Sequence, residues 1–374
     1  MHTFWSPARR AIVATLVLLT VACPTSYLMH EQSLPPAPHV PTGVVQHKVG
    51  VHTRLADEVE RVKIERSLDM VADMGATWIV ELFPWAYAEQ QQGHLNWDHA
   101  DIVVNAAAER HLHIIARLDL VPDWARPEGS SSRLLLPSSY NAYARYVEEF
   151  VRHFQGKVEY VVIWNEPNLS FEWGYRPPDP TAYTALLRAV YARTKAANPN
   201  VQIVSAGLAP NLGQGTAAMN DLTYLEQMYA AGAGSLFDVL GAHSYGLTRP
   251  ATEPAGADRL NFQRVALHRA VMERYGDAGK AVIVLETGWN DAPRWTNAVR
   301  PAQRVIYTVQ AYEQAEAWPW LRALNVFEFR LPAREDNVND YFTFVHFDFT
   351  PRAVYDAVRR YAHGEPPVGD TGTP

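Results

Sequence analysis

The sequence predicts an α/β fold of the (β/α)8 TIM barrel type. Apolar runs with strand character recur eight times between residues 48 and 362, and amphipathic segments separate them. Most of these runs are too uniformly apolar for a sheet with one wet face, which is typical of parallel strands covered on both sides. Eight alternating units are what a closed barrel with an outer ring of helices requires. The runs are Lys48–His52, Thr77–Phe83, His113–Asp119, Val158–Trp164, Val201–Ala206, Phe237–His243, Ala281–Glu286 and Ala323–Phe329.

Helical periodicity separates these runs. In the first such segment, Val59–Met74, five apolar residues share much of one side: Val59, Val62, Leu68, Val71 and Met74. An open, doubly wound sheet is the alternative fold. That fold would require a Gly-rich phosphate turn after an early strand, and the sequence has none. The further helical segments are Tyr140–Phe154, Ala182–Ala197, Arg259–Arg274 and Ala302–Ala315.

The composition is that of a large globular enzyme. The chain has 374 residues, of which 48% are hydrophobic and 20% charged, so one domain can bury a full core. The net charge of −7 is spread along the chain. The sequence has no run of basic residues of the kind that neutralises phosphates, which argues against nucleic acid as a partner. The chain is rich in aromatic residues, with eleven Trp and 18 Tyr, and such rings can stack on the apolar faces of sugars.

The N-terminus has the pattern of an export signal. Arg9 and Arg10 precede the apolar stretch Ala11–Ala22, and Cys23, the only cysteine, follows it. A cleaved signal, lipidation at Cys23 after an imperfect lipobox, and an uncleaved anchor all remain open, so membrane attachment is one possibility. The protein is expected to be exported, to the cell surface or beyond. The predicted organisation is a signal or anchor at 1–30, a Pro-rich linker at 31–46, a catalytic domain at 47–363 and a loose tail at 364–374.

Three short strings stand directly after apolar runs. They are Ile-Trp-Asn-Glu-Pro-Asn at 163–168, Ala-His-Ser-Tyr-Gly at 242–246 and Leu-Glu-Thr-Gly-Trp at 285–289. In a barrel the chemistry is located at the C-terminal ends of the strands, where all three strings fall. We therefore expect Glu166, after the fourth run, and Glu286, after the seventh, to face each other across a bound substrate.

Two facing carboxyl groups are the arrangement that cleavage of a glycosidic bond requires. One group protonates the leaving oxygen, and the other attacks the anomeric carbon. Their environments must hold their pKa values apart. Asn165, next to Glu166, could donate a hydrogen bond to the 2-hydroxyl of the sugar, and Tyr245 could donate to Glu286 and keep it ionised.

These strings resemble those of the retaining glycoside hydrolases of clan A, and most of all the family 39 type. Trp164-Asn165-Glu166-Pro167-Asn168-Leu169 is similar to the acid/base motif of that family, and residues 171–173 continue it. The resemblance covers residues 48–362. It implies that Glu166 is the acid/base, Asn165 the 2-hydroxyl ligand and Glu286 the nucleophile, and that His243 and Tyr245 support the nucleophile.

The sequence departs from the clan pattern at the end of the second strand. Many members have an arginine there that holds the nucleophile, whereas this chain has Trp78-Ile79-Val80-Glu81-Leu82-Phe83. Arg117 in the third run could take that role, or it could pair with Asp119 or Glu81. Glu81 in turn is either a ligand of sugar hydroxyls or the structural partner of Arg117.

Four tryptophans near the predicted barrel rim are candidate sugar platforms. Each could instead pack beneath a loop, as Trp near a barrel rim often does. His243 could likewise simply fill a strand end. The four candidates are Trp85, Trp124, Trp173 and Trp289.

The sequence predicts neither a cofactor nor a metal site. His111 and His113 have no third ligand nearby, and the acidic loop after the last strand lacks the pattern of an EF-hand. The predicted function is a retaining glycosidase acting on an extracellular poly- or oligosaccharide. A transglycosidase and a barrel that binds glycan without cutting it are the alternatives. A serine esterase is not supported, because the sequence has no Gly-x-Ser-x-Gly string. Long loops favour a groove slightly over a pocket, and neither the sugar nor the oligomeric state is determined.

Overall fold

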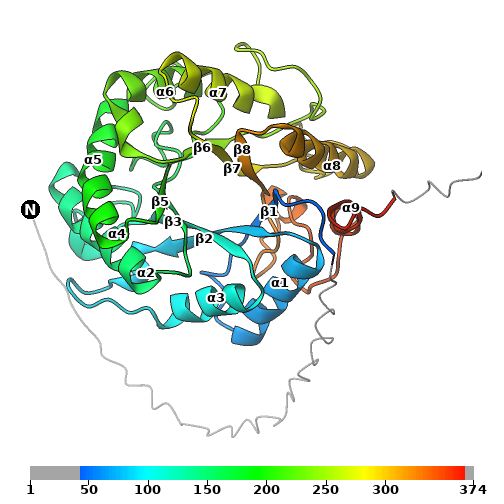
Figure 1. Cartoon of the computed structure of the whole chain (residues 1–374), viewed down its shortest axis with the longest axis horizontal. Helices are drawn as coiled ribbons and strands as arrows, with labels where there is room; N and C mark the ends of the chain where they lie inside the picture. Colours follow the sequence, from blue (N-terminus) through cyan, green and yellow to red (C-terminus); the bar gives the residue numbers. More distant parts are fainter. Residues whose placement is uncertain (1–42, 367–374) are drawn as a thin grey trace, which may run out of the picture. The chain divides into compact units, whose positions relative to one another are not determined.

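The computed structural model describes residues 43–366, in which strands and helices alternate along the chain (Figure 1). Short 3-10 turns, η1 to η5, lie in the connections. The strands are β1 (Val49–His52), β2 (Trp78–Pro84), β3 (His113–Asp119), β4 (Tyr160–Ile163), β5 (Gln202–Ser205), β6 (Leu240–His243), β7 (Val282–Thr287) and β8 (Leu321–Val326). The helices are α1 (Arg61–Asp73), α2 (Trp85–Ala88), α3 (Asp98–Glu109), α4 (Tyr140–His153), α5 (Pro180–Ala197), α6 (Asp221–Ala230), α7 (Val265–Arg274), α8 (Pro301–Ala317) and α9 (Ala353–Ala362).

Within the described residues, the eight strands form one parallel sheet in the order β5-β4-β3-β2-β1-β8-β7-β6. The two ends of this order meet through a parallel bridge between Val204 and Val239. Asp238 N donates to Ile203 O at 2.7 Å, and Ser205 N donates to Val239 O at 3.1 Å. The sheet therefore closes on itself. The (β/α)8 barrel is confirmed, and the doubly wound alternative is excluded.

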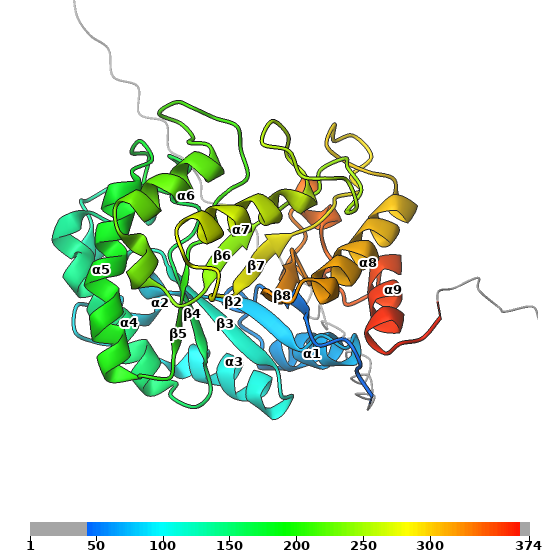
Figure 2. The same cartoon turned by 45° about the horizontal axis from the view of Figure 1, so that its top comes forward.

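The strands are buried on both faces, which explains their uniformly apolar sequences. Helices surround the strands on the outside (Figure 2), and side chains from the strands fill the barrel. Alternating residues of a strand thus meet either the interior or the helices, and both environments exclude water. The interior cluster consists of Trp78, Val80, Ile115, Tyr160, Val162, Val204, Val239, Ile283, Leu285 and Ala323.

Some element boundaries differ from the predicted ones. β8 ends at Val326, three residues before the end of the predicted run. Phe327 and Phe329 lie beyond the strand, and their apolar side chains pack against other parts of the protein. The Phe327 ring contacts those of His52 and Phe342, and Phe329 is 1% exposed. In the predicted segment Val59–Met74, of which Arg61–Asp73 form α1, Leu68, Val71 and Met74 are buried as predicted. Val59, which precedes the helix, and Val62 are 88% and 55% exposed, because the buried side begins only at Ile64.

Among the helices within residues 43–366, none is both long enough and apolar enough to cross a bilayer. The predicted export segment, residues 1–30, and most of the predicted linker and tail lie outside the described residues.

Candidate active site

The barrel brings the three sequence strings together at the C-terminal ends of β4, β6 and β7. His243 and Glu286 are register partners on neighbouring strands, and a bulge lies beside His243. One side-chain atom each of Glu166, His243 and Glu286 lies within 4.8 Å of the other two. Glu166 and Glu286 therefore face each other, although 120 residues, the difference between their numbers, separate them in the chain.

Glu286 is enclosed by groups that favour its charged form. Tyr245 donates its hydroxyl to Glu286 Oε2 at 2.9 Å, and Arg117 Nη1 lies 3.1 Å from Oε1. Burial alone would raise the pKa of the Glu286 carboxyl, but His243, His52, Arg117 and Tyr245 together outweigh it and bring the pKa to about 2. Glu286 is consequently ionised across the physiological range.

Arg117 enters the site from the middle of β3. Besides Glu286, its Nη1 lies 3.4 Å from Asn165 Oδ1, and its Nε lies 3.2 Å from Asp119 Oδ2. The Asp119 contact is an ion pair rather than a hydrogen bond, because the N–H is not directed at the oxygen. Of the two roles predicted for Arg117, the structure thus shows contacts for both: it touches Glu286 and it pairs with Asp119.

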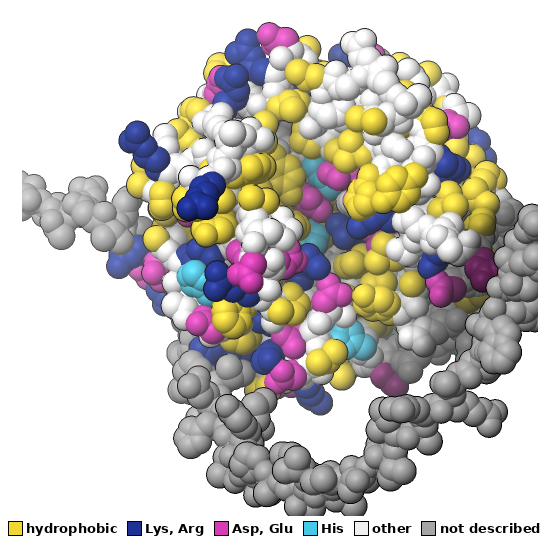
Figure 3. Space-filling view, turned by 180° about the vertical axis from the view of Figure 1, so that it is seen from behind, with side chains coloured by type: hydrophobic (Ala, Val, Ile, Leu, Met, Phe, Trp, Pro, Cys, Tyr) yellow, Lys and Arg dark blue, Asp and Glu magenta, His cyan; other side chains and the backbone are white. Residues whose placement is uncertain are grey.

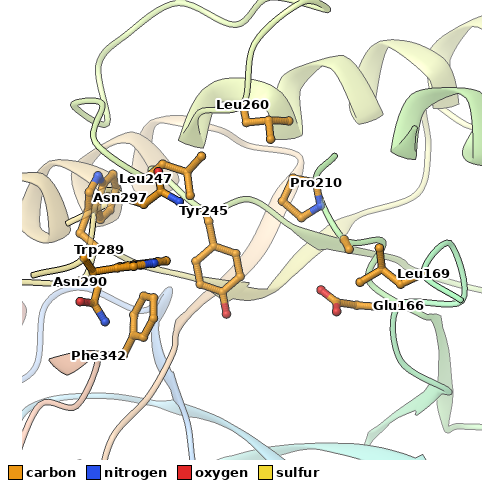
Figure 4. A pocket seen from close by; sticks show the side chains of 13 residues that line it. Glu166, Leu169, Pro210, Tyr245, Leu247, Leu260, Trp289, Asn290, Asn297 and Phe342 are labelled. Atoms are coloured by element: carbon orange, nitrogen blue, oxygen red, sulfur yellow. The ribbon is translucent and has the colours of Figure 1, made fainter. Parts of the chain in front are cut away.

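Glu166 is held by an unusual backbone path. Trp164 and Glu166 have φ values of 76° and 40°, which residues other than glycine rarely adopt. Glu166 N donates to Gly207 O at 3.1 Å, and the buried Trp164 indole donates to Glu172 O at 3.0 Å. The turn after β4 is therefore tied to its neighbours, and the Glu166 carboxylate points toward the side on which the Tyr245 hydroxyl lies (Figure 4).

His243 contacts the carboxylate of Glu166 more closely than that of Glu286. Its Nδ1 lies 2.8 Å from Glu166 Oε1 and 3.8 Å from Glu286 Oε2. Burial would lower the pKa of His243, but the two carboxylates raise it above its usual value. Gly207 makes room for the ring, since a Cβ at that position would lie 2.1 Å from His243 Cδ2. His243 thus connects the two carboxylates.

Two residues of the site were missed by sequence reasoning. His52 lies at the end of β1, with its Nε2 3.8 Å from Glu286 Oε1, and burial lowers the pKa of His52 to about 3. Glu328, just after β8, is fully buried with no hydrogen-bond partner on either oxygen, and burial raises its pKa to about 8. His52 ends an apolar run, so its position was a usable signal. Glu328 carried no such signal, because the predicted run continued past it.

The remaining predicted ligands fall into three groups. Trp289 lines the cavity beside Glu166 but is only 1% exposed, and Trp124 is partly buried, with its indole donating to Glu89 O. Trp85 and Trp173 are fully enclosed, by Tyr143 and Tyr146 and by Trp164 and Tyr183 respectively, so neither ring offers a free face to a sugar.

Glu81 is used within the protein. Its oxygens accept hydrogen bonds from the Thr53 hydroxyl at 2.5 Å and from the backbone N–H groups of Leu55, Ala56 and Leu82. Burial raises the pKa of this carboxyl despite these bonds. Glu81 therefore braces the loop after β1 and is not the partner of Arg117.

A cavity of about 280 Å³ opens beside Glu166 and Tyr245. Figure 3 shows one face of the molecule, in which acidic, basic and histidine side chains lie at the floor of a depression bordered by hydrophobic ones. In the close view, Glu166 lies on one side of Tyr245, and Trp289 and Phe342 lie on the other (Figure 4). The cavity thus adjoins the carboxylate pair.

Glu166, His243 and Glu286 are also the one group of three or more potential ligands in residues 43–366 with metal-like spacing. Two carboxylates and an imidazole could hold a divalent cation. The same three side chains are engaged with Arg117 and Tyr245 and with one another, which accounts for their proximity without an ion.

No protein-family model matches the chain. Among solved structures, it is similar to a family 39 glycoside hydrolase from the gut symbiont Bacteroides cellulosilyticus WH2, with a TM-score of 0.65 and 19% identity. That match covers 84% of this chain and 63% of the other, so the chain spans just under two thirds of the length of that protein. The GH39 enzyme from Xanthomonas axonopodis pv. citri matches with a TM-score of 0.65 and 14% identity, over 89% of this chain and 71% of the other.

A GH39 β-xylosidase from Caulobacter crescentus gives a TM-score of 0.61 and 16% identity, over 87% of this chain and 72% of the other. At these identities the similarity concerns the fold. The chain therefore has the barrel fold of family 39 and other clan A glycoside hydrolases.

Proposed function

We propose that the protein is a retaining glycoside hydrolase that uses Glu286 as nucleophile and Glu166 as acid/base. The observation that carries the proposal is the separation of the two carboxylates, whose nearest ligand oxygens lie within 4.8 Å. Retaining enzymes hold their carboxyl groups about 5–5.5 Å apart, whereas inverting enzymes need about 6.5–9.5 Å to admit a water molecule. The spacing supports attack by the protein itself.

The surroundings of the two carboxylates suit these roles. Glu286 is charged, and Arg117 and Tyr245 orient its two oxygens separately. In the first step one of these oxygens attacks the anomeric carbon, while Glu166 donates its proton to the leaving oxygen and the glycosidic bond breaks. In the second step Glu166 removes a proton from water, which displaces Glu286 and releases the sugar.

The test is the pair Glu166→Ala and Glu286→Ala, assayed on aryl β-glycosides with good and poor leaving groups. Glu166→Ala is expected to lose roughly 10²–10⁴-fold on poor leaving groups and far less on activated ones, with azide restoring turnover and retained configuration. Glu286→Ala is expected to lose nearly all hydrolysis, and azide is expected to give the inverted product.

Glu109→Ala serves as the matched control, because that carboxylate is 71% exposed on α3. It is expected to behave as the wild type. Equal losses on both classes of leaving group in Glu166→Ala, or inverted products from the wild type, would remove the double-displacement mechanism.

We also propose that the enzyme is exported and acts on an extracellular saccharide, because residues 9–23 have the pattern of an export signal. Fractionation of cells that produce the full chain, with Cys23→Ser beside it, tests this. Recovery of the protein in the cytosol would contradict export. Release of Cys23→Ser alone from the membrane fraction would indicate lipidation.

A further inference from the structure

The cavity beside Glu166 is lined by apolar side chains that remain partly exposed. Each of them would lose contact with water if the cavity were filled, and burial of apolar surface contributes about 25 cal/mol per Å². Within the part of the chain that the structure describes, these residues come from the loops after β4 to β8. The six are Leu169, Pro210, Leu247, Leu260, Trp295 and Phe342.

The polar side chains deeper on the same wall are already hydrogen-bonded within the protein. The Tyr245 hydroxyl donates to Glu286, and the Trp289 indole donates to Arg249 O at 2.7 Å. Asn290 donates to Val338 O and accepts from Ala292 N. A sugar ring carries hydroxyls around its edge, and burying them without partners is costly. Apart from Glu166, Asn297 is the exposed polar side chain on this lining, so the wall offers few hydrogen-bond partners to a second sugar.

Polar groups without hydrogen-bond partners are found beside other strands, although Glu328 Oε2 lies 3.7 Å from Arg54 Nη1. Both carboxylate oxygens of Glu328 and Nδ1 of His52 are buried without hydrogen-bond partners, next to the ends of β8 and β1. Neither residue lines the cavity. The unpaired polar groups thus lie at the ends of β1 and β8, whereas the apolar side chains of the cavity come from the loops after β4 to β8.

The position of the two carboxylates indicates which part of the substrate meets the cavity. Glu166 is on the cavity wall, whereas Glu286 is not. The proton of the acid/base goes to the leaving oxygen, so the leaving group must lie next to Glu166. We infer that the cavity holds an apolar leaving group, and that the substrate is a glycoside of an alkyl or aromatic aglycone. This inference rests on the proposed glycosidase function.

Two contacts show that the apolar wall of the cavity is held in place before any ligand binds. The buried Arg264 guanidinium pairs with Asp221 and donates to the carbonyls of Gly256, Ala257 and Arg259, which fixes the segment that ends in Leu260.

Behind Leu247, the Trp289 indole packs directly on Gly246, where a Cβ would lie 2.0 Å from its Cε2. Together with the segment that ends in Leu260, this makes a preformed cavity, which needs little ordering when a ligand binds.

The experiment compares methyl, butyl and hexyl β-glucosides and β-xylosides with cellobiose and xylobiose, using the full chain. Simple alcohols have similar pKa values, so chemistry is nearly constant along the alkyl series and differences report on the cavity. We expect kcat/KM to rise about fourfold per methylene until the cavity is filled, which corresponds to about 0.8 kcal/mol for each buried methylene. The disaccharides are expected to be poorer substrates than the hexyl glycosides.

The variants Leu247→Ser and Leu260→Ser place a hydroxyl on the apolar wall, and the hexyl-to-methyl ratio of kcat/KM is expected to fall at least about tenfold. Leu212→Ser is the matched control, since Leu212 is 42% exposed and not part of the wall, and its ratio is expected to stay at the wild-type value. Circular dichroism checks that each variant is folded.

Each outcome decides a different statement. A wild type that cleaves disaccharides faster than hexyl glycosides, with no rise along the alkyl series, would overturn the apolar leaving group and leave the glycosidase standing. A rise that persists in both serine variants would overturn the assignment to this cavity. Failure to release sugar from every substrate, aryl glycosides included, would reject the glycosidase and the inference together.

Discussion

At the scale of single residues, the carboxyl groups of Glu166 and Glu286 differ in the side chains that contact them. Glu286 has Arg117 on one oxygen and Tyr245 on the other, whereas Glu166 contacts His243. A positive charge beside a carboxylate favours its ionised form, because the protein interior screens charge weakly. The two carboxylates therefore have different neighbours, as the proposed roles of nucleophile and proton donor require.

Arg117→Met is expected to raise the pKa of Glu286 from about 2, because the variant removes a positive charge 3.1 Å from the carboxylate. Activity that needs ionised Glu286 is lost as pH falls through this pKa, so the acidic limb of kcat/KM should move to higher pH. We also expect kcat to fall about 10²–10³-fold, since the donor is preorganised. Rate profiles from pH 3 to 9 measure both effects.

Arg61→Met, with a side chain that is 70% exposed, is the control for Arg117→Met. Its profile should match that of the wild type. An acidic limb that stays in place in Arg117→Met would show that Arg117 does not set the charge of Glu286.

At the scale of elements, the contact between the ends of β5 and β6 positions His243. Gly207 follows β5, accepts a hydrogen bond from Glu166 N, and lies against the His243 ring. A larger residue cannot occupy this position without displacing the ring. The turn after β5 thus contacts both Glu166 and His243.

Gly207→Ala is expected to break the contact between His243 and Glu166, because the new Cβ would lie 2.1 Å from the ring. We expect a loss of kcat of about 10–100-fold, since misplacement by about 1 Å can cost that much. Overpacking should lower the free energy of unfolding by about 1–3 kcal/mol. Steady-state kinetics and urea unfolding measure the two effects.

Gly215→Ala is the matched control for Gly207→Ala, because a Cβ at Gly215 meets open space on the same connection between β5 and α6. Normal activity in Gly207→Ala would mean that the ring can shift without consequence. His243 would then have no positioning role.

At the scale of the whole barrel, α9 ties the last strand–helix unit to the first. The Tyr355 hydroxyl is within hydrogen-bond distance of Met70 O at 3.0 Å and of Asp73 Oδ2 at 2.8 Å, both in α1. Arg359 pairs with Asp73 at 3.2 Å. Contacts between distant parts of the chain of this kind are expected to couple the units into one cooperative structure.

Tyr355→Phe removes a buried hydroxyl and leaves its partners in α1 without that contact. We expect the free energy of unfolding to fall by about 1–3 kcal/mol. If the barrel unfolds as one unit, circular dichroism and tryptophan fluorescence should report the same shifted midpoint in urea.

Tyr361→Phe on the same helix is the control for Tyr355→Phe, since its ring is only partly buried and stacks on Tyr312. Its free energy of unfolding is expected to change by less than about 0.5 kcal/mol, so its urea midpoint should stay close to that of the wild type. Two separate transitions in Tyr355→Phe would show that α9 and α1 unfold independently of the rest.

Much of the fold could be predicted because a parallel barrel produces a regular alternation of apolar and amphipathic segments in the sequence. Each strand is buried on both faces, and each helix has one apolar side, so the eight units are visible along the chain. The proximity of Glu166 and Glu286 was predictable for the same reason, since all strands of a barrel end on one side. Details failed where packing replaced periodicity, as with Val59 and Phe329.

The sequence by itself determined the barrel and placed the two glutamates at its rim, because the strand period and the strand ends are local properties. Only the tertiary structure decided which neighbours each carboxylate meets. Glu81 braces a loop, Trp85 and Trp173 are enclosed, and His52 lies beside Glu286. The stagger of strands and the packing of loops set these outcomes, and both depend on contacts between residues far apart in the chain.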